Sequence, residues 1–439
     1  MDVAIIGTGY VGLVTGTCFA ELGNRVICVD NNESKIAMLK KGQMPIYEPG
    51  LKEMVVHNLK ESRLSFTTDI KEAVKNSKII FIAVGTPPLP NGEADLSFVE
   101  DVACQIARHM TSYRLIVEKS TVPVETGKWV EHTLRVNLKR KITFDVASNP
   151  EFLREGSAIN DFMHPDRIVL GVETKRAQAL LEQLYKPLGA SIVVTDIKSA
   201  EIIKHASNSF LAAKISFINA IATVCELVGA DVVKVAEGMG LDARISAAFL
   251  NAGIGFGGSC FPKDIDAFIH IAEKAGYDFS LLKVVRQINE AQKVLAVEKV
   301  KQALWLIPGK TIGVWGLAFK PGTDDMRLAP AIDIINALQA EGAKVQAFDP
   351  QAMSKARNVL KKIAYCKGPY EAARGADCLI IATEWNEFKT LDLEKVKRLM
   401  KQPIVVDGRN MYDPAIMRKL GFTYIGIGRG YYHPLKRST

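Results

Sequence analysis

Short apolar segments alternate with stretches of helical periodicity along the first part of the chain. The segment 3–6 is rich in β-branched residues, as expected of a buried parallel strand, and the glycine-rich turn GTGYVG follows it at once. A helical pattern comes next. Further strands are predicted at 25–29, 79–84, 115–118 and 168–171, with helical patterns between them. This alternation is typical of an α/β fold built around a parallel sheet.

The pattern changes in the middle of the chain. Between 199 and 240, apolar residues recur at helical spacing with almost no helix-breaking residue. This predicts one long, largely buried helix and a shorter successor. A second long helix is predicted over 280–305, and its length suggests that it connects two domains.

After residue 309 the first pattern returns, offset by about 300 residues. The segments that resemble the first strands, in the same order, are 311–316, 344–349, 376–383 and 403–407. We therefore predict two Rossmann-like domains that flank a helical middle, with boundaries at 1–196, 197–305 and 306–439. The second copy has GLAFK where the first has GxGxxG. It is expected to bind something other than the pyrophosphate of a dinucleotide.

Composition narrows the class of protein. The chain has 439 residues, of which 48% are hydrophobic and 24% charged, which excludes disordered, fibrous and disulfide-rich proteins. No apolar run approaches the roughly 20 residues of a membrane helix, and the start MDVAIIGTGY lacks the basic region of a signal peptide. We expect a cytoplasmic protein without a membrane partner.

Charge and cysteine content narrow the partners further. Net charge is +8, without a basic block that would suit nucleic acid, so a small anionic ligand is the better match. The seven cysteines are scattered and lack CxxC spacing, which predicts neither a disulfide framework nor a metal site.

The turn GTGYVG predicts a site for NAD. Gly7 permits a tight turn, Gly9 lets the backbone approach a pyrophosphate, and Gly12 lets the helix pack on the strand. Asp30 closes the second strand, where it would accept hydrogen bonds from ribose hydroxyls and repel a 2′-phosphate. Lys35 is the nearby cation. The alternative is a glycine turn that arose by coincidence.

A second constellation, 255–264, reads GFGGSCFPKD. Cys260 is expected just before a helix that Pro262 opens, where a thiol is more readily ionised, and Lys263 adds positive charge. Asp264 is close enough to share the site. The alternatives are a packed cysteine and an acid that only complements the helix dipole.

Three further segments carry polar side chains in places that suit ligands. Lys204 and Asn208 share one face of the long helix, whereas His205 points elsewhere and is expected to be structural. The motifs STVP at 120–123 and NPEFLREG at 149–156 follow strand ends, where open α/β sheets bind ligands. Read alone, the Lys–Asn pair could be a solvated edge, and either motif could be a turn or a helix cap.

Taken together, these motifs resemble the UDP-glucose 6-dehydrogenase branch of the UDP-glucose/GDP-mannose dehydrogenase family. The matching stretches are GTGYVG, VGTP, STVP, NPEFLREG, the Lys–Asn pair, FLNAGIGFGG, SCFPKD and GLAFKPGTDDMR, in the family's order over nearly the whole chain. The resemblance implies an N-terminal NAD domain, a central helical dimerisation region with a long connecting helix, and a C-terminal domain that binds the nucleotide sugar. It also implies a homodimer through the central helix.

The implied reaction converts UDP-glucose, two NAD and water into UDP-glucuronate and two NADH. Cys260 would be the nucleophile, Lys204 and Asn208 would stabilise an oxyanion, and Asp264 would tune the thiol. The remaining expected catalytic residues, which would assist proton transfer through water, are Glu151 and Thr121. The expected cofactor contacts are Gly7, Gly9, Tyr10, Val11, Gly12, Asp30, Lys35, Thr86, Thr121, Glu155, Lys263 and Arg327. The expected substrate contacts are Glu151, Phe152, Leu153, Arg154, Glu155, Lys204, Asn208, Arg244, Phe249, Leu250, Asn251, Ala252, Gly253, Gly257 and Lys320.

Other activities remain open from the sequence. A sister enzyme would act on GDP-mannose or a UDP-N-acetylhexosamine. A β-hydroxyacid dehydrogenase also combines GxGxxG with a Lys-x-x-x-Asn helix, but performs one oxidation and has no nucleophilic cysteine. A binding or sensor protein could keep the fold without catalysis. Arg244, expected to cross the dimer interface, could instead be an exposed cation at a helix end.

Overall fold

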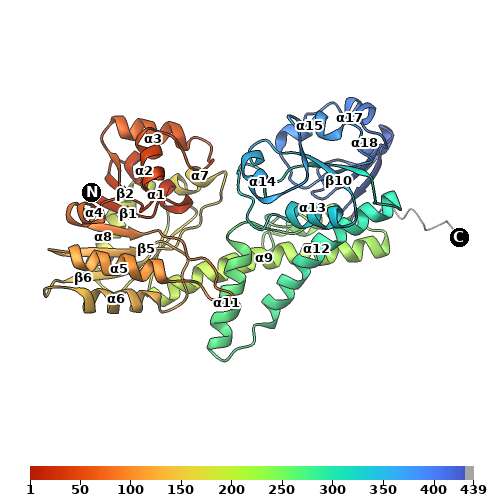
Figure 1. Ribbon diagram of the computed structural model, residues 1–439. Helices are drawn as coiled ribbons and strands as arrows, with labels where there is room; N and C mark the ends of the chain where they lie inside the picture. The colour runs from red at the N-terminus through yellow and green to blue at the C-terminus, as the bar shows by residue number, and fades with distance from the viewer. Residues whose placement is uncertain (431–439) are drawn as a thin grey trace. The chain divides into compact units, whose positions relative to one another are not determined.

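The computed structural model describes residues 1–430, which form two units (Figure 1). The first unit comprises Met1–Ser207 and Asp266–Tyr277, and the second comprises Asn208–Ile265 and the chain from Asp278 onward. Two of the three boundaries between the units fall inside helices, after Ser207 and after Ile265, and the third, after Tyr277, falls between two helices. The division into three domains at residues 196 and 305 stays a prediction.

The first unit is built on an eight-stranded sheet in the order β3-β2-β1-β4-β5-β6-β7-β8. All neighbouring strands are parallel except β6 and β7. The strands are β1 (Asp2–Ile6), β2 (Arg25–Val29), β3 (Leu64–Thr67), β4 (Ile79–Ile82), β5 (Arg114–Glu118), β6 (Phe144–Ser148), β7 (Ile168–Val172) and β8 (Ile192–Thr195). The chain reverses its strand order between β1 and β4, where α/β folds bind ligands.

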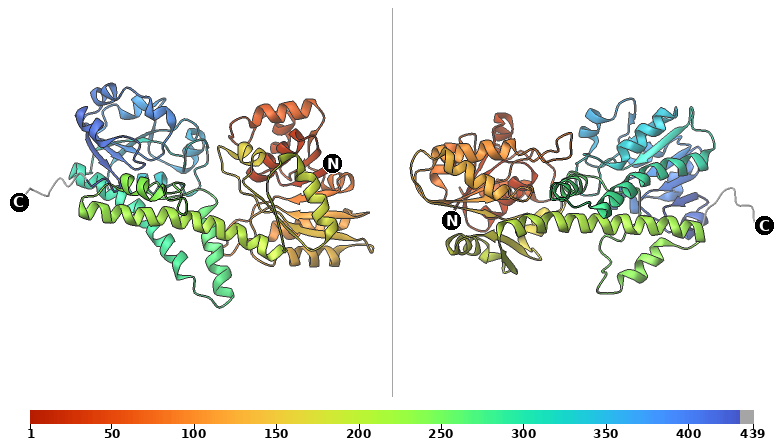
Figure 2. Two further views of the ribbon diagram at one scale, coloured as in Figure 1. Left: turned by 180° about the vertical axis from the view of Figure 1, so that it is seen from behind. Right: turned by 90° about the horizontal axis from the view of Figure 1, so that it is seen from below.

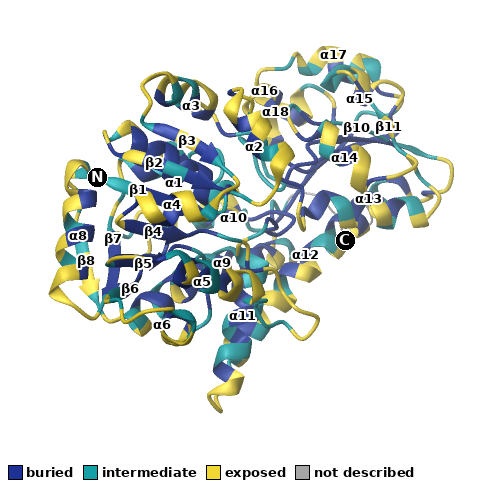
Figure 3. Ribbon diagram, turned by 60° about the vertical axis from the view of Figure 1, so that its left-hand side comes forward, coloured by how far each residue is buried: buried dark blue, intermediate teal, exposed yellow. Residues whose placement is uncertain are grey.

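Helices cover both faces of this sheet, because successive side chains of each strand point to opposite sides. Val3 and Ile5 belong to the core formed with α1, α3, α7 and α8, whereas Ala4 and Ile6 belong to the core formed with α4, α5 and α6. The helices are α1 (Tyr10–Glu21), α2 (Glu33–Lys40), α3 (Leu51–Lys60), α4 (Ile70–Asn76), α5 (Ser97–His109), α6 (Thr126–Asn137), α7 (Ala158–Met163) and α8 (Lys175–Tyr185), followed by the short 3₁₀ helix Lys186–Leu188. Figure 3 shows the buried residues concentrated in the strands.

The second unit contains a six-stranded, fully parallel sheet in the order β11-β10-β9-β12-β13-β14. Counted within the unit, this is the order 3-2-1-4-5-6 of a Rossmann fold. The strands are β9 (Thr311–Trp315), β10 (Lys344–Phe348), β11 (Ala364–Tyr365), β12 (Cys378–Ile381), β13 (Ile404–Asp407) and β14 (Thr423–Gly426). The helices between them are α13 (Pro330–Ala340), α14 (Met353–Val359), α15 (Pro369–Ala373), α16 (Asn386–Lys389), α17 (Leu393–Leu399) and α18 (Pro414–Lys419). The predicted α/β class with two Rossmann-like sheets is confirmed.

Four helices form the middle of the chain, and both views of Figure 2 show the longest as one continuous ribbon. They are α9 (Ile197–Val228), α10 (Val232–Gly240), α11 (Phe261–Lys274) and α12 (Ser280–Leu304). The predicted long helix, its shorter successor and the second long helix are therefore confirmed. The helix α11 begins at Phe261, so Pro262 is its second residue rather than its first.

One expectation about α9 was wrong. The helix was expected to be largely buried, yet only 33% of its most apolar 18-residue window is buried within the chain. The mean hydropathy of that window is 1.6, so by length and composition alone the helix could cross a membrane. Its exposed apolar residues include Phe210, Phe217, Val224, Leu227 and Val228. Such a face calls for a partner surface.

Candidate functional site

The glycine turn after β1 has the geometry that a dinucleotide requires. Gly7 has a φ of +101°, which favours glycine, and a Cβ on Gly12 would lie 1.9 Å from the carbonyl oxygen of Gly7. At Gly9 a Cβ would meet nothing within 4 Å. No side chain caps the start of α1, so its first N–H groups remain available to an anion. The turn therefore fits a pyrophosphate.

Asp30 lies at the carboxyl end of β2 and is held in place by four donors. Its Oδ2 accepts from Thr8 N at 3.0 Å, Thr8 Oγ1 at 2.7 Å and Lys35 Nζ at 2.8 Å, and its Oδ1 accepts from Asn32 N at 3.0 Å. Burial opposes ionisation, but the hydrogen bonds from Lys35 and Thr8 outweigh it and hold the Asp30 pKa below its ordinary value. A fixed carboxylate at this edge suits ribose hydroxyls.

The loop that follows β5 brings Thr121 to the neighbouring strand end. Thr86 Oγ1 donates to Thr121 O at 2.9 Å, and Ser120 Oγ donates to Val84 O at 2.6 Å. His205 Nε2 lies 2.8 Å from Val122 O, which ties the same loop to α9 and agrees with a structural role for His205. Thr86 and Thr121 are thus brought together near the switch point of the first sheet.

Glu151 and Lys204 form a buried ion pair. Their side chains are each 5% exposed, and Lys204 Nζ lies 3.0 Å from Glu151 Oε1. Leu153 N donates to Glu151 Oε2 at 2.5 Å, and the Lys204 ammonium also lies 5.4 Å from the ring centre of Phe152. Because removal of one partner would leave an uncompensated buried charge, this pair is costly to break. The two residues, 53 positions apart, belong to one cluster.

A buried lysine that the sequence analysis missed lies close to this pair. Lys119 Nζ donates to Asn149 Oδ1 at 2.9 Å, and the Tyr185 hydroxyl donates to the same oxygen. Burial lowers the pKa of Lys119 to about 7, with smaller effects from the charges of Glu151 and Lys204. A small cavity lined by Lys119, Asn149, Glu151 and their neighbours adjoins the network. The signal in the sequence was the charged pair Glu118–Lys119 at the carboxyl end of an apolar strand.

The segment 152–156 is fixed by partners that the motif did not reveal. Arg154 forms a two-pronged pair with Asp161 through Nε at 3.0 Å and Nη2 at 2.5 Å. Gly156 N donates to Glu48 Oε2 at 2.6 Å and to the Tyr10 hydroxyl at 2.9 Å, and that hydroxyl also contacts Glu48. Glu48 therefore links the start of α1 to the segment that carries Glu155.

In the second unit, Cys260 lies at the entrance to α11 and is exposed, whereas the other six cysteines are buried or half-buried. One turn later, Asp264 is 1% exposed. Its Oδ2 accepts from Asn208 Nδ2 at 2.6 Å, and its Oδ1 lies 2.8 Å from Lys263 Nζ. An accessible thiol, an acid, an amide and a cation are therefore clustered.

The predicted substrate segment 249–257 is held by its backbone. Gly253 N donates to Asn219 Oδ1 at 2.9 Å, and Phe256 N donates to Asn289 Oδ1 at 2.7 Å. A Cβ on Gly257 would lie 2.1 Å from the carbonyl oxygen of Leu328. Leu250, Ala252 and Gly253 are buried, whereas Asn251 is exposed.

The residues that lock this segment were missed because they come from distant parts of the sequence. Asn219 lies on α9, Asn289 on α12, and Arg409 follows β13, where its Nη1 donates to Gly255 O at 3.0 Å. Asn410 Nδ2 donates to Ala252 O at 3.3 Å. Nothing local in their own segments points to this task.

The second glycine turn differs from the first in what its acid does. Asp349, at the end of β10, is fully buried, and its Oδ2 accepts from Leu317 N at 2.7 Å, Ala318 N at 3.0 Å and Trp385 Nε1 at 3.1 Å. Its Oδ1 accepts from the backbone of residues 351 and 352. The carboxylate has no capacity left for a ribose, which supports the expectation that this copy does not bind a dinucleotide.

Besides Lys263, three predicted contact residues in the second unit carry positive charge. Lys320 follows the second glycine turn, with its ammonium 5.5 Å from the ring centre of Phe319. Arg327 is paired with Asp325 at 2.6 Å, and Arg244, whose side chain is 89% exposed, is paired with Asp242 at 2.6 Å. The exposure of Arg244 leaves both of its readings open.

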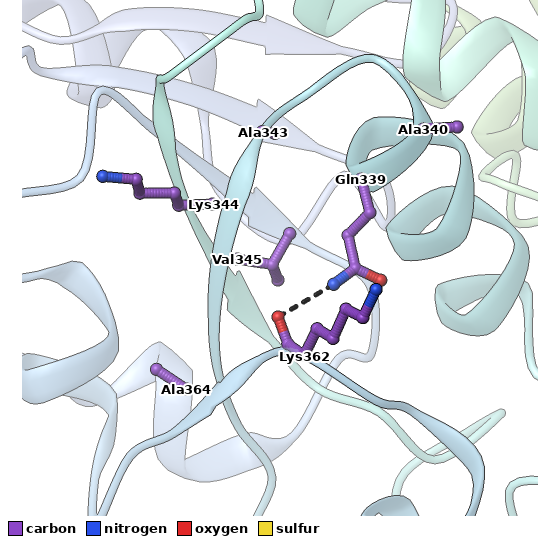
Figure 4. A pocket seen from close by; sticks show the side chains of 7 residues that line it. All are labelled: Gln339, Ala340, Ala343, Lys344, Val345, Lys362 and Ala364. Atoms are coloured by element: carbon purple, nitrogen blue, oxygen red, sulfur yellow. Dashed lines mark hydrogen bonds between the residues drawn. The ribbon is translucent and has the colours of Figure 1, made fainter.

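A shallow pocket lies at the other edge of the second sheet (Figure 4). Gln339, Lys344, Lys362 and Ala364 are among its lining residues, and Gln339 Nε2 donates to Lys362 O at 2.9 Å. Lys344 is the first residue of β10, so the pocket opens at the amino ends of the strands. Ligands of such sheets bind at the carboxyl ends, so the pocket is not part of the candidate site.

Three domain models of one protein family match successive segments of the chain. The UDP-glucose/GDP-mannose dehydrogenase family matches with its NAD binding domain at residues 1–189, its central domain at 198–291 and its UDP binding domain at 313–414. The UDP-glucose 6-dehydrogenase TuaD of Bacillus subtilis strain 168 is 52% identical over 428 residues, covering 97% of this chain and 93% of that protein.

Solved structures agree. A UDP-glucose dehydrogenase from Pyrobaculum islandicum is 41% identical, with a TM-score of 0.91 and coverage of 97% of both chains. A UDP-D-ManNAc dehydrogenase from Pyrococcus horikoshii is 29% identical, with a TM-score of 0.86 and coverage of 98% of this chain and 100% of that one. The chain therefore belongs to the UDP-glucose/GDP-mannose dehydrogenase family of NAD-dependent oxidoreductases.

Proposed function

We propose that this chain oxidises UDP-glucose twice at C6, so that UDP-glucose, two NAD and water give UDP-glucuronate and two NADH. The observation that carries the proposal is the exposed thiol of Cys260 directly before α11, next to the buried Asp264 that binds both Asn208 and Lys263. A double oxidation needs such a nucleophile, because an aldehyde has no hydride to give until a group adds to its carbonyl carbon.

Cys260 performs the step that distinguishes the second oxidation from the first. Its position at a helix N-terminus favours the thiolate, which attacks the C6 aldehyde and forms a thiohemiacetal. Loss of hydride from that carbon gives a thioester. Water then attacks the thioester carbonyl, the carbon–sulfur bond breaks, and the thiolate of Cys260 is regenerated as the carboxylate leaves.

The polar residues around the thiol stabilise charge and move protons. Lys204 and Asn208 lie on one face of α9, where they stabilise the oxyanion that develops at C6. Asp264 orients Asn208 through the 2.6 Å hydrogen bond and handles the proton of the attacking water. Glu151, held by Lys204, and Thr121, held by Thr86, assist proton transfer through water.

The first unit holds the cofactor. Bound NAD accepts a hydride in each of the two oxidations. The turn at Gly7, Gly9 and Gly12 receives the pyrophosphate, Asp30 receives the ribose hydroxyls, and Lys35 fixes the Asp30 carboxylate. The further contacts proposed are those of Tyr10, Val11, Thr86, Thr121, Glu155, Lys263 and Arg327.

The second unit supplies most contacts to the nucleotide sugar. The segment Phe249–Gly253 and Gly257 wrap the ligand, and Lys320 supplies charge for its phosphates. The other proposed contacts are Glu151, Phe152, Leu153, Arg154, Glu155, Lys204, Asn208, Asn251 and Arg244. Arg244 would reach the site of a second chain.

We further propose that the protein is a cytoplasmic homodimer. Phe210, Phe217 and Val224 recur every seven residues on α9, and they are exposed by 67%, 51% and 52%. A second copy of the same helix buries such a stripe, because a seven-residue repeat keeps one face turned toward its partner. A partner chain, rather than a bilayer, then covers the apolar face.

The experiment that tests this function measures NADH formed from a panel of nucleotide sugars. UDP-glucose, GDP-mannose and UDP-N-acetylmannosamine are supplied separately with excess NAD. UDP-glucose should give the highest kcat/KM and two NADH per sugar consumed. A single NADH per sugar, or a higher kcat/KM with another sugar, would overturn the proposal.

A further inference from the structure

Two buried carboxyl groups lie beneath the Thr121 loop, and the mechanism above uses neither. Glu118 is the last residue of β5, and Glu201 is on the first turns of α9. They are 1% and 2% exposed. Two ionised carboxylates packed together without water are strongly unfavourable, so the pair needs an explanation.

Glu201 is satisfied as an ionised group. Its Oε2 accepts from Glu125 N at 2.8 Å, and its Oε1 accepts from Gly127 N at 2.9 Å. Both N–H groups belong to the start of α6, where the helix dipole favours a negative charge. Glu201 therefore caps α6 from another helix and ties α6 to α9.

Glu118 has the opposite surroundings. Within residues 1–430, neither of its oxygens receives a hydrogen bond from an N–H group or an alcohol. A Cβ on Gly127 would lie 3.5 Å from Glu118 Oε2, and the N–H of the same Gly127 binds Glu201, so the neighbour of Glu118 is a carboxyl that can only accept when ionised. Burial and the charge of Glu201 raise the Glu118 pKa well above its ordinary value. A proton on Glu118 resolves the conflict, because its O–H then donates to Glu201.

The pair lies next to catalytic groups on two elements. Glu201 is three residues before Lys204 and four before His205, so these residues follow one another along one face of α9. His205 binds Val122 O, and Glu201 binds the N–H of Glu125. The loop that carries Thr121 is thus attached to α9 at two points, both of which follow that residue in the chain.

We propose that Glu118 and Glu201 share one proton, and that this carboxyl pair positions the Thr121 loop against the Lys204 turn of α9. The positioning role rests on the function proposed above, because Thr121 and Lys204 act in that reaction. The sharing of one proton by Glu118 and Glu201 does not depend on that function. Glu118 and Glu201 are positioning residues, since they act through the loop and the helix that they join.

The other charged residues near Glu118 and Glu201 lie on α6, on α9 and directly after β5. Lys198 of α9 and Lys128 of α6 are both paired with Glu125, at 2.8 Å and 3.7 Å, so they are largely neutralised. Burial raises the pKa of Glu201 to about 7, although the backbone hydrogen bonds from Gly127 and Glu125 oppose the rise; the charge of Glu125 adds to it and that of Lys198 reduces it. The neighbour of Glu118 on β6 is the uncharged Ser148, and Lys119 follows Glu118 in the chain.

The test compares Glu118→Gln with Glu118→Leu. The Gln amide keeps a donor for Glu201 without a titrating proton, whereas Leu keeps the volume without a donor. We expect the Gln variant to retain kcat within about threefold of wild type and the Leu variant to lose at least tenfold. Equal kcat values for the two variants would overturn the positioning role.

A second measurement tests the shared proton without any assay of activity. The unfolding equilibrium constants of wild type and Glu118→Gln are measured in urea from pH 5 to 8. A raised pKa means that the folded wild type holds a proton that the unfolded chain releases, so stability falls as pH rises. The wild-type constant, divided by that of the Gln variant, should rise by up to tenfold per pH unit.

A ratio that stays constant over this range would show that Glu118 is ionised in the folded protein, and would overturn the shared proton. Wild type that fails to oxidise UDP-glucose would instead contradict the proposed function. The unfolding result would stand in either case, and it also holds if the Leu variant does not fold.

Discussion

Two glycines of the first turn are required for different reasons, although the motif treats them alike. A methyl group on Gly12 would collide with the carbonyl of Gly7, whereas a methyl group on Gly9 would enter open space beside the start of α1. The backbone of Gly9 is also extended, with φ −68° and ψ −170°, which alanine adopts readily. Gly12 is thus needed by the fold, whereas the fold places no such demand on Gly9, as expected if Gly9 serves the proposed NAD site.

Gly9→Ala should therefore fold normally and bind NAD poorly, because the methyl group occupies the approach to the pyrophosphate. We expect a melting temperature within about 1 °C of wild type and a KM for NAD raised at least tenfold. Gly12→Ala is the matched control and should lose about 1–3 kcal/mol of stability through overpacking. Thermal unfolding and steady-state kinetics separate the two. Normal NAD kinetics in Gly9→Ala would refute the assigned site.

Asp30 is the second residue whose role can be isolated. Asp30→Ala removes a carboxylate that accepts from Thr8 and Lys35, so ribose hydroxyls lose their acceptor and Lys35 is freed. The KM for NAD should rise about 10–100-fold, and discrimination against NADP should weaken, as kinetics with both cofactors would show. Wild type that used NADP as well as NAD would contradict the role of Asp30.

At the scale of elements, α9 carries three groups of residues with different roles along its length. Its first turns carry Glu201 and Lys204, its middle carries Asn208 and Asn219, and its last turns expose Leu227 and Val228 by 76% and 72%. Helical periodicity predicted the helix, but it could not predict which of its apolar residues the chain itself leaves exposed. Burial within one chain and burial in a dimer give the same pattern in sequence.

Leu227 lies three residues after Val224, on the same face of α9 as the apolar stripe, so Leu227→Asp should dissociate the proposed homodimer. A buried, unpaired carboxylate at a symmetric interface is introduced twice, once from each chain. Sedimentation velocity should show the mass falling from two chains to one. Val136→Asp is the matched control, because Val136 is 68% exposed on α6 and lies outside the stripe. Equal masses for the two variants would contradict the interface.

At the scale of the whole molecule, one sequence pattern occurs twice and is used in two ways. The strand order 3-2-1-4-5-6 recurs in the second sheet, and both copies place a glycine turn after the first strand. The acid that closes the second strand is half-buried in the first copy, but fully consumed by the backbone and Trp385 in the second. The two copies therefore share a fold but differ in the ligands that they are suited to bind.

Lys320→Ala tests this division of ligands. A charged hydrogen bond to phosphate contributes about 1.5–3 kcal/mol, so its loss should raise the KM for UDP-glucose about 10–100-fold. The KM for NAD should change less than threefold. Lys344→Ala is the control, because Lys344 lines the pocket at the amino ends of the strands. An unchanged KM for UDP-glucose in Lys320→Ala would make Lys320 a surface cation.

What the sequence could predict follows from how local each signal is. Adjacent residues determine the strand-turn-helix unit around Gly7 and the start of the helix at Cys260, so the sequence predicted both. The strand β3 alternates buried and exposed residues over only four positions, and Val193 and Val194 of the edge strand β8 are both exposed, so neither strand was recognised. Both strands pair only after the chain folds.

The missed members of the candidate site share one physical cause. Asn219, Asn289 and Arg409 satisfy the backbone of the segment 253–256 from 33 or more residues away. Each of these side chains acts through a hydrogen bond to a backbone amide or carbonyl far away in the sequence. Such a role leaves no periodicity or motif in the residue's own segment. Glu118 escaped notice for the same reason, since its partner Glu201 is 83 residues away.

The central claim is covalent catalysis by Cys260, and one measurement on Cys260→Ser tests it most directly. Serine keeps the size of the site, but its hydroxyl ionises at a far higher pH than a thiol, so attack on the aldehyde and hydrolysis of the ester both become slow. Intact-protein mass spectrometry is recorded after mixing with UDP-glucose and NAD, alongside steady-state NADH formation. The account predicts near-normal binding, turnover lower by several orders of magnitude, and accumulation of bound aldehyde or a covalent adduct. UDP-glucuronate formed by Cys260→Ser at close to the wild-type rate would contradict it.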